Sequence, residues 1–286
     1  MTRAKTVRTI PWQGKKPSKV LKGKPLVPSA AVSLRYYWRL RGLIRRMSVE
    51  TRREIKELFD SSHAKEYFAE DASIASQARI LMSALSARFD DLFGTKSKTY
   101  AEDVVNESAK HSASTLKLSL AELAEGVTLK VQTFGPEMEE IVKASIAENV
   151  SLIKSIPSQY FTQVQGAVMR SITTGQGMAD LVPFIKKYEG VTLNRARLIA
   201  SDQTRKITGN INRAHMESVG LKKFEWLHTH GEQFPRPLHR DVLNGNVYSF
   251  ANPPVIDKKT GERGFPGQLI GCKCAMVPVI DFESDF

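Results

Sequence analysis

The spacing of apolar residues over most of the chain restricts the fold more than any other feature. From about Ser33 to Val219, apolar side chains recur at intervals of three and four residues, which places them on one side of an α-helix. Residues that often start or stop helices divide this pattern, and we expect separate helices between them. These expected breaks are Ser48, Gly94, Gly126, Pro157, the turn at 173–177, and Gly190 followed by Thr192. The chain is therefore predicted to be mainly α-helical.

The chain after Gly220 has a different character. Three short stretches rich in strand-forming residues are separated by loops that contain many prolines and glycines. The expected strands are Lys223–Thr229, Val247–Phe250 and Ala275–Ile280. A module this small often needs a staple or a larger neighbour to pack against. The predicted fold class is thus mainly α, with a helical body, a small C-terminal α+β module and a basic disordered N-terminal arm.

Positive charge is concentrated near the N-terminus. Residues 1–60 contain 16 Lys and Arg against four Asp and Glu, so their net charge equals the +12 of the whole chain. Residues 1–32 also interleave prolines and glycines with lysines, which disfavours helix and strand. A field of this sign attracts polyanions. We expect double-stranded DNA to contact this region, through Lys15, Lys16, Lys19, Lys22, Lys24, Arg35, Arg39, Arg41, Arg45 and Arg46. An acidic protein, a membrane surface or no dedicated partner are the alternatives.

These patterns give three predicted domains. They are a basic irregular arm (1–32), a helical region (33–148), and a C-terminal domain (149–286) made of helices over 149–219 and a loop-rich β module over 220–286. No apolar run approaches the ~20 residues of a membrane-spanning helix, and the N-terminus lacks the apolar stretch of a secretory signal. Two cysteines give no disulfide framework. We therefore expect a protein made and kept in a reducing cytosol.

Both cysteines, Cys272 and Cys274, lie in the β module with one residue between them. With His239 they are candidate zinc ligands, and His228, His230 or Asp241 can supply a fourth. On a regular strand their α-carbons would lie roughly 6.5–7 Å apart. Both can bind one ion only if the chain bends, which Gly271 permits. The alternative, which the spacing favours, is that two small thiols pack in a loop-rich core and no cofactor is bound.

An enzyme is the competing functional class. His239 followed by Asn244, near cysteines, faintly resembles the metal-dependent nuclease sites of the HNH type. Such a site needs a further histidine downstream, and none follows His239. No histidine adjoins the cysteines in sequence to activate a thiol. We therefore expect no catalytic residue, and keep a metal-dependent nuclease or toxin-like enzyme acting on nucleic acid as the alternative.

Four stretches in a fixed order resemble the phage head morphogenesis family typified by protein F of phage Mu, the minor head (minor capsid) proteins. They lie between Asn149 and Asp281. They are "NVSLIKSIP" with the following glycine turn, "RARLIASDQTRKITGNINRAHMESVG", "FEWLHTHGEQFPRPLHRDVLNG" and "PGQLIGCKCAMVPVI". The chain departs from the family pattern at Ser201, where Arg is usual, in the loop 232–236, and in having Lys273 between the cysteines.

The resemblance implies a phage structural protein. Members join the procapsid in few copies near the portal and are linked to DNA packaging or ejection. The implied partners are the portal protein and the major capsid or scaffold protein, without a membrane. The implied location is the head of the virion, after synthesis in the host cytoplasm.

The resemblance also marks residues that we interpret as a structural network. They are Asp202, Gln203, Trp226, Arg236, His239, Gly245, Cys272 and Cys274. A solvated polar face of the long helix is the simplest interpretation of Asp202 and Gln203, and the resemblance favours the alternative that they bond the β module and lock it onto that helix. Arg236 and His239 would then be partners of Asp202 or Glu232, since buried charges need partners.

Overall fold

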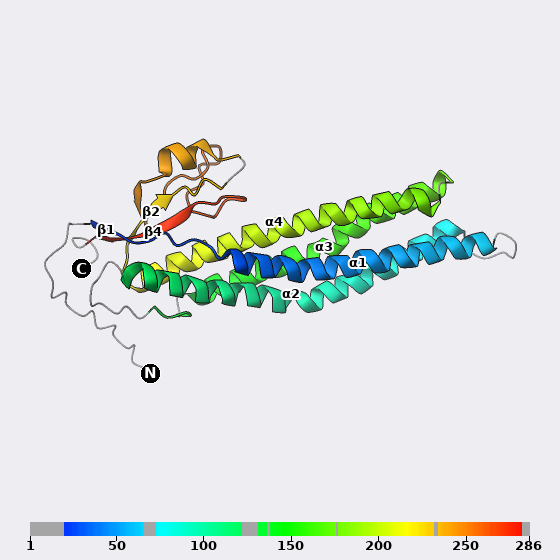
Figure 1. Cartoon of the computed structure of the whole chain (residues 1–286), viewed down its shortest axis with the longest axis horizontal. Coiled ribbons are helices and arrows are strands. Elements are labelled where there is room, and N and C mark those ends of the chain that lie inside the picture. Colours follow the sequence, from blue (N-terminus) through cyan, green and yellow to red (C-terminus); the bar gives the residue numbers. More distant parts are fainter. Residues whose placement is uncertain are drawn as a thin grey trace.

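Four long helices form an elongated bundle that carries a small sheet at one end (Figure 1). The computed structural model describes residues 20–65, 73–121, 131–135, 138–175, 177–231 and 234–281. The helices are α1 (Ala30–Lys65), α2 (Ile74–Ala121), α3 (Glu139–Thr173) and α4 (Met178–Ser218). The predicted fold class, a mainly helical body with a small C-terminal module, is confirmed.

One apolar core runs through the bundle and takes side chains from all four helices. Leu40 of α1, Phe89 of α2, Phe161 of α3 and Ile207 of α4 are all buried in it. The rings of Phe89 and Phe161 stack with their centroids 5.9 Å apart. The expected boundary between residues 148 and 149 falls inside α3, so the two regions that it separates share this core.

Several predicted helix breaks are wrong. Gly94 lies inside α2, Pro157 inside α3, and Gly190 inside α4. The hydroxyl of Ser48, expected to cap a new helix, instead donates to Glu189 Oε2 at 2.7 Å across the bundle. Thr192 donates back to the Tyr188 carbonyl at 2.7 Å within its own helix. Packing of a continuous apolar face outweighs the local cost of a glycine or proline.

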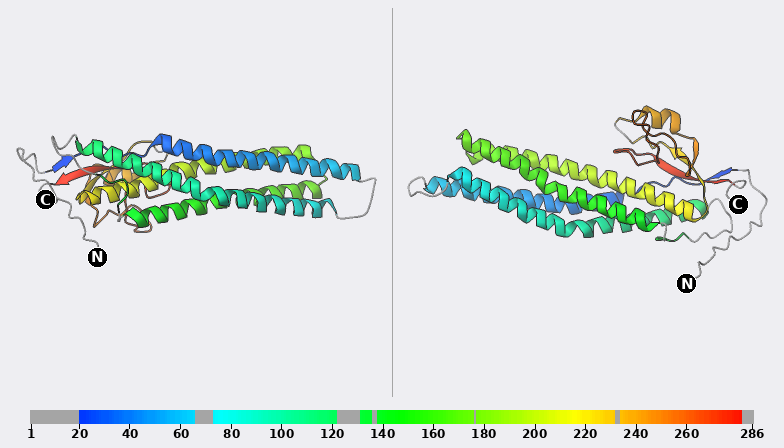
Figure 2. Two further views of the ribbon diagram at one scale, coloured as in Figure 1. Left: turned by 90° about the horizontal axis from the view of Figure 1, so that it is seen from below. Right: turned by 180° about the vertical axis from the view of Figure 1, so that it is seen from behind.

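The sheet has four antiparallel strands in the order β1-β4-β2-β3. The strands are β1 (Val20–Lys22), β2 (Lys223–Leu227), β3 (Val247–Ser249) and β4 (Ala275–Asp281). The three strands expected after Gly220 are thus present. Further views show the sheet beside the C-terminal end of α4 (Figure 2).

The described part of the expected arm, residues 20–32, is ordered and belongs to the fold. β1 pairs with β4, and the N–H of Leu26 donates to the Met276 carbonyl at 2.8 Å. Leu26 is only 1% exposed, and its own carbonyl accepts a hydrogen bond from Asn212 of α4. The sequence prediction was wrong here because β1 has too few residues to show an alternating pattern. Residues 1–19 lie outside the described residues.

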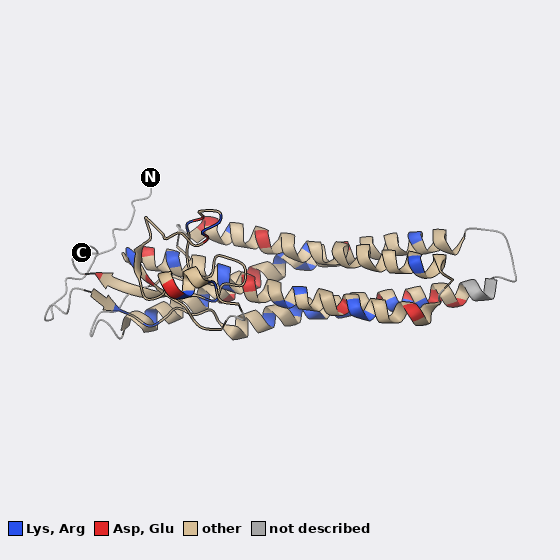
Figure 3. Ribbon diagram, turned by 90° about the horizontal axis from the view of Figure 1, so that it is seen from above, with Lys and Arg blue, Asp and Glu red and all other residues tan. Residues whose placement is uncertain are grey.

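Charged residues of both signs are scattered along the helices (Figure 3). Among the described residues, no helix combines the length and apolar character that crossing a membrane requires.

Candidate functional site

Two cysteines and two histidines meet in the β module. His228 follows the last residue of β2, His239 lies in a single π-helical turn, η2 (Leu238–Leu243), and Cys272 and Cys274 lie just before β4. All four residues are buried. Gly271 has φ 73°, a left-handed conformation that bends the chain immediately before the cysteines. Two cysteines separated by one residue can bind the same ion only if the chain bends. The chain has such a bend at Gly271.

The donor atoms of this cluster approach one another closely. Nδ1 of His239 lies 3.5 Å from Cys272 Sγ and 3.8 Å from Cys274 Sγ. The ligand atoms of these three residues all lie within 4.8 Å of one another. Nδ1 of His228 lies 3.6 Å from Cys274 Sγ. The structure thus brings His228 to the cluster, whereas His230 is exposed, and the side chain of Asp241 pairs with Arg240.

The ring of His239 is oriented by its other nitrogen. Nε2 lies 2.9 Å from the carbonyl of Ile256. A carbonyl only accepts hydrogen bonds, so Nε2 carries a hydrogen and donates it to Ile256. The other ring nitrogen, Nδ1, faces the two sulfurs. The indole of Trp226 packs edge-on against the ring, with centroids 5.0 Å apart. His239 is therefore held in one orientation.

The pKa values of Cys272 and His239 reflect their contact. Interaction with Cys274, and with His239, lowers the pKa of the Cys272 thiol to about 4, although burial opposes this. Burial acts to lower the pKa of His239, but the hydrogen bond and the charge of Cys272, together with the bond to the Ile256 carbonyl, outweigh it and the net pKa is raised. The two shifts together favour a proton held between the Cys272 sulfur and the His239 nitrogen.

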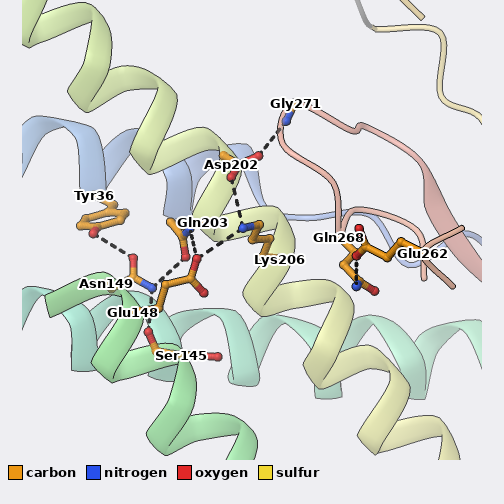
Figure 4. Close-up of polar contacts among 10 residues, drawn as sticks. All are labelled: Tyr36, Ser145, Glu148, Asn149, Asp202, Gln203, Lys206, Glu262, Gln268 and Gly271. Atoms are coloured by element: carbon orange, nitrogen blue, oxygen red, sulfur yellow. Dashed lines mark hydrogen bonds and ion pairs between the residues drawn. The ribbon is translucent and has the colours of Figure 1, made fainter. Parts of the chain in front are cut away.

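Asp202 connects helix α4 to the loop that carries the cysteines (Figure 4). Its Oδ1 accepts the backbone N–H of Gly271 at 2.8 Å, and Lys206 lies 3.9 Å from its Oδ2. Burial raises the pKa of the Asp202 carboxyl, while the Gly271 N–H and Lys206 oppose that shift. The contact with Gly271 is of the kind that the sequence predicts for Asp202.

Gln203 faces the bundle, not the module as expected. Its Oε1 accepts a bond from Asn149 at 3.1 Å, and its Nε2 donates to Glu148 at 2.9 Å (Figure 4). The Tyr36 hydroxyl donates to Asn149 Oδ1 at 2.9 Å, which extends the chain of bonds to α1. Neighbouring residues on a helix point in different directions, so Asp202 and Gln203 bond different parts of the molecule.

The remaining members of the predicted network have other partners. Arg236 donates to the Ile270 carbonyl at 3.0 Å, and neither it nor His239 bonds Asp202 as expected. Glu232 lies outside the described residues. Gly245 has φ 80°, and its N–H donates to the Trp226 carbonyl at 2.8 Å. Arg236 and Gly245 thus fix loops around the cluster.

A second contact between module and helix is missed by sequence reasoning. A Cβ added to Gly209 of α4 would lie 2.9 Å from the Pro266 carbonyl, so only glycine lets this loop approach. Arg213, one turn further, lies over the Phe265 ring at 4.8 Å. The detectable signal was glycine in the middle of a predicted helix, which marks close backbone approach.

Many residues expected to contact DNA pair with acids instead. Arg35 bonds Glu107 at 2.6 Å, Arg39 lies 3.1 Å from Asp103, Arg46 bonds Glu50 at 2.7 Å, and Lys22 pairs with Glu225. Arg41 lies over the Trp38 ring, Arg45 is exposed, and the Lys24 carbonyl accepts the Ser119 hydroxyl. Lys15, Lys16 and Lys19 lie outside the described residues.

The fold and the site define a helical bundle that carries a small β module with a buried cysteine–histidine cluster. Residues 162–277 match the family described as Phage Mu protein F like protein. This part of the chain is similar to that family, and it contains the cluster and Asp202. An "Uncharacterized protein" of Haemophilus influenzae (strain ATCC 51907 / DSM 11121 / KW20 / Rd) is 29% identical over 263 residues, covering 91% of this chain.

The chain spans 56% of the length of that relative. No solved structure matches.

Proposed function

We propose that this protein is a minor head protein of a tailed phage, acting in procapsid assembly near the portal and in DNA packaging or ejection. The observation that carries the proposal is the match of residues 162–277 to the Mu F-like family. The proposed partners are the portal protein and the major capsid or scaffold protein, and the proposed location is the head of the virion.

The geometry supports a structural role for the matched domain. Asp202 and Gln203 lie side by side in sequence, and their bonds join the module to α4 and α4 to the rest of the bundle. Gly209 adds a close backbone contact between the two parts. Such an arrangement holds the module at a fixed place on a long rod, which suits a protein that bridges other subunits.

A DNA-binding role is proposed for the N-terminal residues 1–19. They contain six Lys and Arg and no acid. The basic residues of α1 are less suited to this role because Arg35, Arg39 and Arg46 already pair with acids. We therefore assign most of the proposed DNA contacts to residues 1–19, before β1.

The nuclease alternative has less support from the site. A catalytic metal centre keeps one position open for water or substrate. His228, His239, Cys272 and Cys274 are each at most 4% exposed. A buried cluster with four donors suits a structural role, so no second function is proposed.

Proteomics of phage particles tests the proposal. Procapsids and mature heads are purified from a producing strain, and each protein is quantified by mass spectrometry against the major capsid protein. We expect this protein in the particles at low copy number, and normal heads to be lost when its gene is deleted. Its absence from both particles, with unchanged phage yield on deletion, would refute the proposal.

A further inference from the structure

We propose that His228, His239, Cys272 and Cys274 bind one zinc ion that is a structural part of the β module. This inference does not depend on the proposed function. The sequence leaves two alternatives open for the cysteines, zinc binding and packing as buried thiols. The proposal chooses zinc binding and identifies His228 as the fourth ligand.

Three sulfur–nitrogen distances in the cluster are close to those of a tetrahedral zinc site. Zinc binds sulfur at ~2.3 Å and nitrogen at ~2.0–2.1 Å, so a sulfur and a nitrogen on one tetrahedral ion lie about 3.5–3.6 Å apart. The three sulfur–nitrogen distances that define the cluster are 3.5, 3.6 and 3.8 Å. The ligand atoms of His239, Cys272 and Cys274 lie within 4.8 Å of one another, and His228 reaches this group through Cys274 Sγ.

Packing of the thiols does not explain the histidines. His228 is 2% exposed and His239 is 0% exposed, and a buried polar ring is costly unless its nitrogens have partners. Both rings direct Nδ1 toward cysteine sulfur, and a neutral thiol is only a weak hydrogen-bond partner. A zinc ion bound to both nitrogens and both sulfurs satisfies all four groups.

The surrounding bonds have the pattern of a second coordination shell. A histidine ligand usually donates its other N–H to a carbonyl or carboxylate. Nε2 of His239 has the Ile256 carbonyl at 2.9 Å. The backbone N–H of His228 donates to Asn244 Oδ1, and Asp202 holds Gly271 before the cysteines. Each ligand-bearing segment is thus fixed by a bond outside the cluster.

The site lies where a cross-link would stabilise the module. It joins three segments that are far apart in sequence: the end of β2, the turn η2 and the approach to β4. Small loop-rich modules often depend on a metal or disulfides for stability. Four protein ligands fill the coordination of structural zinc, which fits a site of buried residues.

Metal analysis of the full-length chain tests the proposal. The protein is purified in reducing buffer without chelator, reconstituted with a small excess of zinc, and freed of unbound metal by gel filtration. We expect about one zinc per chain, and at least about a tenfold loss in the Cys272→Ser/Cys274→Ser variant. A chain without zinc after reconstitution, or a double variant with undiminished zinc, would overturn the proposal.

Neighbouring histidines provide a matched pair of variants. His228→Asn removes the proposed fourth ligand, whereas His230→Asn changes an exposed residue whose ring packs edge-on against that of His228, with centroids 4.8 Å apart. His230 has φ 50°, a conformation that Asn tolerates. We expect zinc affinity to fall at least about tenfold in His228→Asn and to change much less in His230→Asn, which loses only a ring contact with the ligand. An equal loss in both variants would contradict the assignment of His228.

Cobalt gives a readout that does not require a folded variant. Co²⁺ is added to the metal-free wild-type chain, and its visible and near-ultraviolet spectrum is recorded. We expect the intense bands of tetrahedral coordination, together with thiolate-to-cobalt charge transfer, and we expect zinc to remove both. The weak spectrum of octahedral cobalt would overturn the proposal, whatever the variants do.

Discussion

At the scale of single residues, two adjacent side chains on α4 connect the module to the bundle. Asp202 bonds the loop before the cysteines, and Gln203 bonds Asn149 and Glu148 within the bundle. The sequence predicts both as polar network members but not their separate directions. Those directions depend on how the helix is rotated against its neighbours, which a single sequence does not specify.

Asp202 makes the stability of the fold depend on pH. Burial raises the pKa of its carboxyl above the ordinary value, so the folded state holds the proton more tightly than the unfolded state. The free energy of unfolding should then fall as pH rises from that ordinary value through the raised one. Asp202→Asn removes this titration. We expect the wild type to lose stability relative to Asp202→Asn over that window, measured by urea unfolding at a series of pH values.

Asp241 is a control of opposite sign. Hydrogen bonding to Arg240 lowers the pKa of this exposed carboxyl. The wild type should gain stability relative to Asp241→Asn as pH rises through the lowered pKa toward the ordinary one. A stability difference between wild type and Asp202→Asn that does not change with pH would refute the prediction.

At the scale of elements, the existence and type of most helices and strands could be predicted, but the continuity of the helices could not. Pro157 is buried inside α3, and Gly190 lies inside α4. A break signal describes a local preference of about 1 kcal/mol for glycine and ~3 for proline, whereas a helix with a buried face gains more from packing. The short β1 could not be predicted because its partner β4 lies at the other end of the chain.

Two glycines, one inside α4 and one just after its last residue, distinguish a continuous helix from a broken one. Gly190 lies within the helix, and a Cβ there meets no atom within 4 Å. Gly190→Ala should therefore raise the free energy of unfolding by about 0.5–1 kcal/mol. Gly220 ends the helix with φ 88°, so Gly220→Ala should lower it by about 1–2 kcal/mol. Thermal or urea unfolding followed by circular dichroism measures both, and destabilisation by Gly190→Ala would indicate a break at 190.

At the scale of the whole molecule, the module, the bundle and the segment before α1 form one unit. Residues 20–27 contribute β1 and the buried Leu26, which bonds β4 through its N–H and α4 through its carbonyl. The sequence indicated the module and the meeting of His239 with the cysteines, but left the fourth donor open among His228, His230 and Asp241. The choice depends on the loops around β2 and η2, whose conformations follow from tertiary contacts.

Residues 20–26, from β1 to Leu26, belong to the fold. They therefore mark where the segment that we propose to bind DNA ends. Removing residues 1–19 deletes six basic residues and no described part of the fold, whereas removing residues 1–29 also deletes β1 and the buried Leu26. We expect the shorter deletion to weaken DNA binding and leave the unfolding temperature unchanged, and the longer one to lower that temperature. Each lost phosphate contact should reduce the slope of log affinity against log salt by about 0.9.

Single lysines on either side of this boundary give a matched pair of variants. Lys19 precedes β1, whereas Lys22 pairs with Glu225 of β2. Lys19→Gln should reduce the salt slope by about one unit, since one released counterion is lost with one phosphate contact. Lys22→Gln should change it much less, because its charge is already neutralised. Fluorescence anisotropy with a double-stranded oligonucleotide measures both slopes. Equal slopes for the wild type and the chain lacking residues 1–19 would show that this segment does not contact DNA.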